Sequence, residues 1–113
     1  MAATYVSNLT INTGEDFQQR FFLEATNDSS AWNLTDATVT SQMRKHPASS
    51  TSTEFTAEII DPPSSGGIKI SLTNEQTTSL KPGRYVYDIV VTTSNIKTRV
   101  IEGMVLVRQG VTR

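Results

Sequence analysis

The sequence predicts an all-β fold, an antiparallel β-sandwich of about seven strands with one short helical turn. Ser and Thr make up about a quarter of the chain, whereas Lys, Glu and Ala are sparse, and this composition lowers helix propensity. Apolar and polar residues alternate in short segments that end at turn residues. A Ser/Thr-rich loop after Pro47 implies pairing between distant strands, which fits a sandwich better than a closed barrel.

Seven segments carry the strand pattern. The alternation predicts that the inward-facing residues of the second to fourth strands are Phe17, Phe21, Leu23, Val39, Met43, Phe55, Ala57 and Ile59. The last two segments are rich in Val, Ile and Tyr, so we expect them to form a hairpin at the centre of one sheet. The predicted strands are residues 5–11, 17–25, 37–45, 54–61, 68–72, 84–92 and 98–107.

One helical turn is expected before Pro82. Thr73 and Gln76 have the spacing of a capping box, in which a hydroxyl side chain begins the helix and an amide three residues later reaches back. The pattern therefore predicts a short helix over residues 74–80.

Length and composition limit the classes of function. The chain has 113 residues, which suits a single domain over residues 1–113, with residues 1–7 as a flexible or pairing N-terminal segment. It contains no cysteine, so neither disulfides nor thiolate-bound zinc are expected. The net charge is -1 without a basic run, which argues against nucleic-acid binding. No apolar run is long enough to span a membrane, and no secretory signal is visible.

No catalytic or metal site is predicted. His46 is the only histidine, so it lacks the partners of a zinc site or a His-based triad, and we expect it in an exposed loop. Asp88 and Glu102 are expected on neighbouring strands with Arg99 nearby, which is typical of a solvated ion-pair face. Because no nucleophile and base can be combined, the sequence predicts neither an enzyme nor a cofactor.

Apolar residues that the alternation places on outward faces form a candidate protein interface. Contiguous outward apolar groups often mark a contact with another protein. The alternative is that the faces are assigned wrongly or that a loop covers them. The candidate interface residues are Phe22, Ile60, Val86, Val90, Met104 and Leu106.

A second candidate site is a loop around Trp32. Sugar sites commonly place an aromatic ring beside amides and carboxylates, and Trp32 has Asn27, Asp28 and Asn33 close by in the sequence. This pattern favours, as the alternative function, a surface-recognition module that binds a glycan or a host receptor through its loops. For Trp32 itself, its place in a polar turn favours a residue that caps the core over one that contacts a partner.

A family resemblance covers nearly the whole chain. It is carried by Ile68–Thr73, by Leu80–Asp88 with its Leu-x-Pro-Gly-x-Tyr turn, and by Glu102–Val107, and two earlier turns at Thr13–Phe17 and Asn33–Ala37 agree with it. The chain resembles small immunoglobulin-like virion modules of tailed bacteriophages, including the N-terminal domain of some upper-baseplate proteins.

The resemblance implies an immunoglobulin-like sandwich and a non-enzymatic structural or interaction role in a baseplate, tail, neck or decoration component. The expected partners are other virion proteins, and a second copy of the chain is a further candidate partner. The protein would be made in the host cytoplasm and reside in the virion. The lack of cysteine agrees with folding in that reducing compartment.

Overall fold

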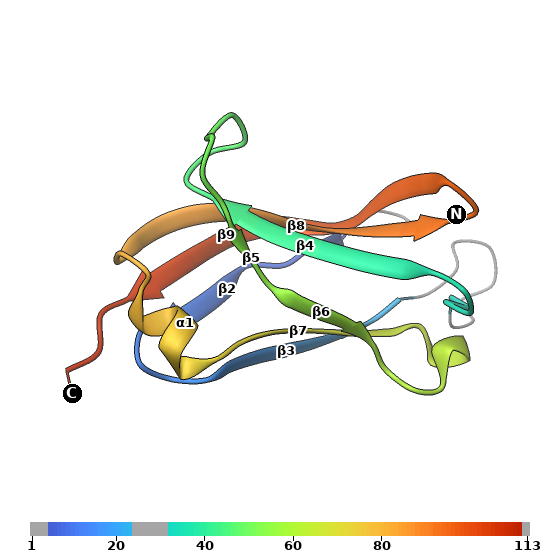
Figure 1. The fold of residues 1–113 in the computed structure, drawn as a ribbon, viewed down its shortest axis with the longest axis horizontal. Coiled ribbons are helices and arrows are strands. Elements are labelled where there is room, and N and C mark those ends of the chain that lie inside the picture. Colours follow the sequence, from blue (N-terminus) through green and yellow to red (C-terminus); the bar gives the residue numbers. More distant parts are fainter. Residues whose placement is uncertain (1–4, 24–31, 112–113) are drawn as a thin grey trace.

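Two β-sheets pack face to face in the computed structural model, which describes residues 5–23 and 32–111 (Figure 1). The predicted all-β sandwich is therefore confirmed. The large sheet has the order β1-β9-β8-β4-β5, with β2 also paired to β9, and the small sheet has the order β3-β7-β6. The strands in the described residues are β1 Tyr5–Val6, β2 Leu9–Asn12, β3 Phe17–Phe22, β4 Thr38–Arg44, β5 Thr53–Glu54, β6 Thr56–Ile59, β7 Gly67–Leu72, β8 Gly83–Thr93 and β9 Ile96–Arg108.

The core lies between the sheets and confirms the predicted inward faces. Ile70 of β7 and Ile89 of β8 are fully buried, and they represent the small and the large sheet respectively. The Phe55 ring lies 5.9 Å from Phe17 and 6.3 Å from Tyr87, measured between centroids, so aromatic contacts join the two layers. The predicted inward residues are all buried or packed against the core, namely Phe17, Phe21, Leu23, Val39, Met43, Phe55, Ala57 and Ile59.

Two of the seven predicted strands are each divided in the structure. The segment over 5–11 becomes β1 and β2, which both pair with β9 in parallel, whereas the other strand pairs are antiparallel. The segment over 54–61 becomes β5 in the large sheet and β6 in the small sheet. Phe55, which lies between them, is buried and its N–H donates to the carbonyl of Ser41. The chain thus passes from the large sheet to the small sheet at Phe55, whose ring contacts both Tyr87 of the large sheet and Phe17 of the small sheet.

The hairpin of β8 and β9 forms the centre of the large sheet, as predicted. Ser94 and Asn95 make its turn with φ values of 49° and 68°, the left-handed pair that a two-residue hairpin requires. The register shifts between Ile89 and Val90, which pair with Ile101 and Arg99 and leave Val100 without a partner across the hairpin. This bulge turns both Val100 and Ile101 toward the core, where both are buried.

The connection from β7 to β8 contains helix α1, Asn74–Thr78. The predicted capping box is present: the Thr73 hydroxyl accepts from the Gln76 backbone N–H, and the Gln76 side chain accepts from the Thr73 N–H. A further hydrogen bond holds the end of this connection against β8, because the hydroxyl of Tyr85 donates to the carbonyl oxygen of Lys81 at 2.7 Å. A 3-10 turn, Pro63–Ser65, makes the corner between β6 and β7.

Candidate functional site

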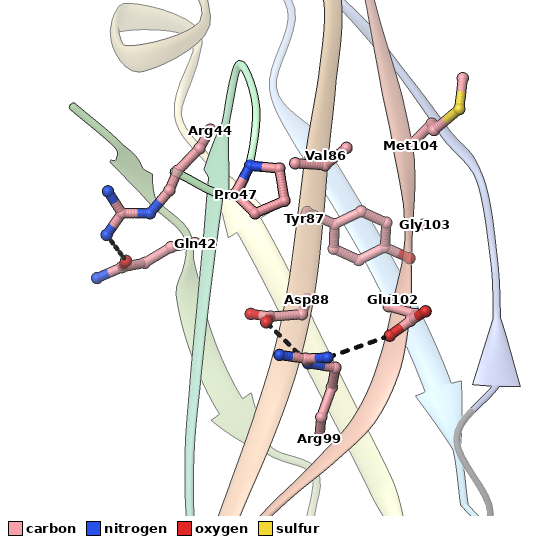
Figure 2. Close-up of a pocket in the computed structure, with 10 residues that line it drawn as sticks. All are labelled: Gln42, Arg44, Pro47, Val86, Tyr87, Asp88, Arg99, Glu102, Gly103 and Met104. Atoms are coloured by element: carbon pink, nitrogen blue, oxygen red, sulfur yellow. Dashed lines mark hydrogen bonds and ion pairs between the residues drawn. The ribbon is translucent and has the colours of Figure 1, made fainter. Parts of the chain in front are cut away.

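The outer face of β4, β8 and β9 carries a groove of about 560 Å³ (Figure 2). Strand pairing sets its floor in rows across the sheet. One row contains Arg44, Val86 and Met104, because Arg44 pairs with Val86 and Val86 pairs with Met104. Pro47, in the loop after β4, forms a wall beside Val86, and Met104 lies on the far side. The groove therefore has apolar groups on both sides of the central strand.

A charged cluster occupies the next row. Asp88 pairs with Glu102 across the hairpin, and Arg99 contacts both, with Nε 3.2 Å from Asp88 Oδ2 and Nη1 3.6 Å from Glu102 Oε1. The bulge at Val100 is the reason that Arg99 and Glu102, three residues apart, share the outer face. The predicted ion-pair face is confirmed, and its side chains are between 37% and 59% exposed.

Arg44 attaches the loop after β4 to the groove. Its Nη1 donates to the carbonyl of Ser49 at 2.6 Å, and its Nη2 donates to Gln42 Oε1 at 3.0 Å. The bond to Ser49 joins the end of β4 to the far side of the loop segment that contains Pro47, whereas the bond to Gln42 stays within β4. The wall of the groove is thus held by the side chain of Arg44, a half-buried residue.

The predicted interface residues divide between two surfaces. Val86, Met104 and Leu106 lie together on the outer face of the large sheet, where Met104 is 45% and Leu106 43% exposed. We call these three residues the apolar ridge. Val90 is half-buried on the same face and pairs with Arg99, so the charged cluster separates it from the ridge.

Phe22 and Ile60 lie on the small sheet instead. Phe22 pairs with Gly67, and the N–H of Ile60 donates to the Gly67 carbonyl at 2.9 Å. A Cβ at Gly67 would lie 2.9 Å from the Phe22 ring and 3.0 Å from Ile60 Cβ, so both side chains close over the glycine. Phe22 remains 63% exposed. The sequence analysis places these residues in one interface because alternation predicts the face of a strand on which a side chain lies, but not the sheet to which the strand belongs.

The candidate ligand loop is only partly within the described residues. Asn27 and Asp28 lie outside them. Trp32 is half-buried and packs against the core, which agrees with the core-capping interpretation, and its backbone N–H donates to the carbonyl of Leu23 at 3.0 Å. Asn33 Oδ1 accepts from the Thr35 N–H and hydroxyl at 3.0 and 2.6 Å, so this amide oxygen is engaged within its own turn.

Two other features complete the comparison with the sequence. His46 is exposed in a loop, as predicted. Within residues 5–23 and 32–111, no cluster of three or more His, Asp or Glu side chains has the arrangement of a metal site. The helices described there are also too short to cross a membrane.

A contact that the sequence analysis missed joins the first strands to the core. The Tyr87 hydroxyl donates to the carbonyl oxygen of Ser7 at 2.7 Å, and burial raises the pKa of Tyr87 to about 12. Ser7 can approach because Gly103 has no side chain: a Cβ there would collide with the Ser7 carbonyl. A glycine inside a strong strand pattern was the available signal for such a close approach.

No protein-family model and no curated protein sequence matches the chain. Among solved structures, it is similar to InlP of Listeria monocytogenes, with a TM-score of 0.49, 13% identity, and coverage of 90% of this chain and 26% of that one. It is also similar to a family 123 glycoside hydrolase from Clostridium perfringens, with a TM-score of 0.48, 12% identity, and coverage of 96% and 23%. The chain thus spans about a quarter of the length of each protein.

Proposed function

We propose that this protein is a non-enzymatic structural component of a tailed-phage virion and that it acts through protein–protein contacts. The observation that carries the proposal is the apolar ridge, because Met104 and Leu106 are 45% and 43% exposed beside each other on the outer face of β9. Contiguous exposed apolar groups on the outer face of a sheet favour a contact surface. The resemblance to virion modules, which covers nearly the whole chain, supplies the kind of assembly.

The immunoglobulin-like topology belongs to the same proposal. The orders β3-β7-β6 and β9-β8-β4 correspond to the B-E-D and G-F-C groups of immunoglobulin sandwiches. Tyr85 near the start of β8 donates its hydroxyl to Lys81 upstream, which is the arrangement of the tyrosine corner in that fold. Both features support the family on which the virion role rests.

The ridge and the charged cluster have different roles in the proposed contact. Burial of the Leu106 and Met104 side chains provides the favourable free energy, about 25 cal/mol for each Å² of apolar surface removed from water. Asp88, Arg99 and Glu102 lie beside the ridge at partly exposed positions. Charges at the rim of an interface mainly fix orientation and exclude wrong partners. The partner is therefore expected to present an apolar patch with charges at its border.

The test replaces Leu106 by Asp in the virus that encodes the chain. A charge on the ridge opposes burial of that ridge, so incorporation into purified particles is expected to fall by about tenfold or more, which corresponds to about 1.4 kcal/mol. The matched control is Val111→Asp, because Val111 is 93% exposed and lies after the end of β9, so it is not one of the ridge residues. Its incorporation should equal that of the wild type.

The proposal fails if wild-type chain is missing from purified particles, or if Leu106→Asp is incorporated normally. Circular dichroism and thermal unfolding of the purified variant must accompany the assay. Loss of folding in Leu106→Asp would place Leu106 in the core and would also contradict the proposal.

A further inference from the structure

Strand β3 forms an open edge of the small sheet. It pairs with β7 along its whole length, from Phe17 opposite Leu72 to Phe22 opposite Gly67. Within the described residues no strand lies on its other side. By contrast, β9 at the corresponding side of the large sheet is covered by β1 and β2. An open edge offers unpaired N–H and C=O groups to another strand.

Alternation along β3 identifies which backbone groups face outward. The Leu23 N–H donates to the Gly66 carbonyl, so odd-numbered residues point their backbone groups toward β7 and even-numbered residues point theirs to the open side. The side-chain amide of Gln19 donates to the Arg20 carbonyl at 3.3 Å, which agrees with an outward Arg20 carbonyl. The backbone groups that face the open side of β3 are those of Gln18, Arg20 and Phe22.

The usual protections of an edge strand are sparse in β3. Natural edges are blunted by proline, by bulges or by several charges. The strand has the sequence Phe-Gln-Gln-Arg-Phe-Phe, with one charge, no proline and a regular register to β7. Gln19 has the inward orientation of Phe17 and Phe21 but is exposed, and both phenylalanines are only half-buried. The core is thus incompletely covered along this edge.

We propose that β3 pairs with β3 of a second copy of the chain, antiparallel and centred on Gln19, so that the two small sheets form one continuous sheet. This inference rests on the proposed function, for which it names one of the partners. The contact is isologous, because each copy contributes the same strand to a two-fold axis.

Three physical conditions select the register. Outward backbone groups must meet outward backbone groups, so even-numbered residues pair with even-numbered residues. A register centred on Arg20 would place two guanidinium groups opposite each other, which is unfavourable. A register centred on Gln18 would pair fewer residues of β3. With Gln19 at the centre, Arg20 lies opposite Gln18 of the second copy, and Phe17 lies opposite its Phe21.

The apolar surface at the end of β3 gives independent support. A depression of about 220 Å³ lies between β1 and β3 and is lined by Tyr5, Phe21, Phe22, Leu23 and Ile101. In the proposed register the Phe17 ring of the second copy lies opposite Phe21, beside this depression. The two-fold axis repeats the arrangement at the other end, so the open core of each copy is covered by an aromatic ring of the other.

The sharpest experiment introduces a single cysteine into a chain that has none. In the proposed register position 19 faces itself as a non-hydrogen-bonded pair with Cβ atoms about 4.5–5.5 Å apart, close enough for a disulfide after a small adjustment. Gln19→Cys should therefore form a covalent dimer when oxidised glutathione is added, as seen on a non-reducing gel. Gln18→Cys is the matched control, because position 18 faces position 20, and its dimer should form at least about tenfold more slowly.

A second variant blocks the edge without a cross-link. Gln18→Pro removes an outward N–H but no hydrogen bond to β7, which makes proline tolerable at this edge position. Light scattering should show that the wild-type mass rises up to twofold between micromolar and near-millimolar concentration, whereas the mass of Gln18→Pro stays constant.

Equal cross-linking of Gln19→Cys and Gln18→Cys, or a wild-type mass that never rises, overturns the β3 pairing. Those outcomes leave the virion proposal standing, because incorporation into particles through the ridge is measured separately. Conversely, a β3 dimer together with normal incorporation of Leu106→Asp would keep the pairing and refute the role of the ridge.

Discussion

The two sheets present different surfaces for contact. The large sheet has long central strands, a covered edge at β9, and an outer face where side chains form a ridge, a groove and a charged cluster. In the part of the chain that the structure describes, the small sheet has three strands, and its distinctive feature is the open backbone edge of β3. One sandwich can therefore bind a partner through side chains on one sheet and through main-chain hydrogen bonds on the other. We infer that they serve different partners.

The largest loss of stability is expected for a variant that displaces the strands covering the edge of the large sheet. Gly103→Ala forces a methyl group into the Ser7 carbonyl, so β1 and β2 must shift away from β9. Overpacking of this kind costs about 1–3 kcal/mol or more, and urea unfolding measures it. The control is Gly14→Ala, where φ is 87° but nothing lies within 4 Å of the new Cβ, so only a backbone cost of about 1 kcal/mol applies.

If the two glycine variants lose equal stability, the close approach of Ser7 does not hold the edge. Gly103→Ala that is folded but aggregates more readily than Gly14→Ala would support the difference between the edges of the two sheets. The large sheet would then have acquired an open edge like that of β3.

An intermediate effect is expected at the hydrogen bond below that edge. Tyr87→Phe removes the bond to Ser7 and should lower the free energy of unfolding by about 1 kcal/mol. The tyrosine also gives a pH signature, because its pKa is raised from 10.0 to about 12 in the folded state. The neutral hydroxyl is favoured by folding, so its contribution is complete below pH 10 and is lost as pH rises through about 12.

The free energy of unfolding of Tyr87→Phe should therefore decrease less between neutral and alkaline pH than that of the wild type. Urea midpoints between neutral pH and pH 12 provide the measurement. Identical pH profiles for the two proteins would contradict the buried, hydrogen-bonded state of this phenol.

The smallest effect is expected in the charged cluster. Arg99→Gln removes the ion pairs to Asp88 and Glu102, but these groups are partly exposed, so the loss in stability should stay below about 1 kcal/mol and shrink with added salt. Arg84→Gln on the same face is the control. A loss that is large or independent of salt would mean that the cluster is a structural core element and not the rim of a contact surface.

Much of the fold was predictable because alternation and turn residues act locally. The inward faces, the capping box at Thr73 and the β8–β9 hairpin follow from residues close in the sequence. The division of the first strand at Ser7 and the change of sheet at Phe55 were not predicted, because each depends on a distant partner, β9 in one case and Ser41 in the other.

The candidate site was predicted in part for the same reason. The outward orientation of Met104 and Leu106 follows from alternation, but their separation from Phe22 and Ile60 depends on which sheet each strand joins. The contact of Arg99 with both acidic side chains depends on the bulge at Val100, and no turn residue in the sequence predicts this bulge. The open edge of β3 is a property of strand order and has no local sequence pattern.

The most direct test of the division between the sheets is the solution mass of three purified proteins, followed by light scattering over concentration. The wild type and Leu106→Asp should both rise from 12.4 kDa toward twice that mass, because the ridge has no part in the β3 pairing. Gln18→Pro should remain at the monomer mass while its circular dichroism stays that of the wild type. A constant wild-type mass, or a dimer abolished by Leu106→Asp and kept by Gln18→Pro, would contradict the assignment of self-association to the small sheet.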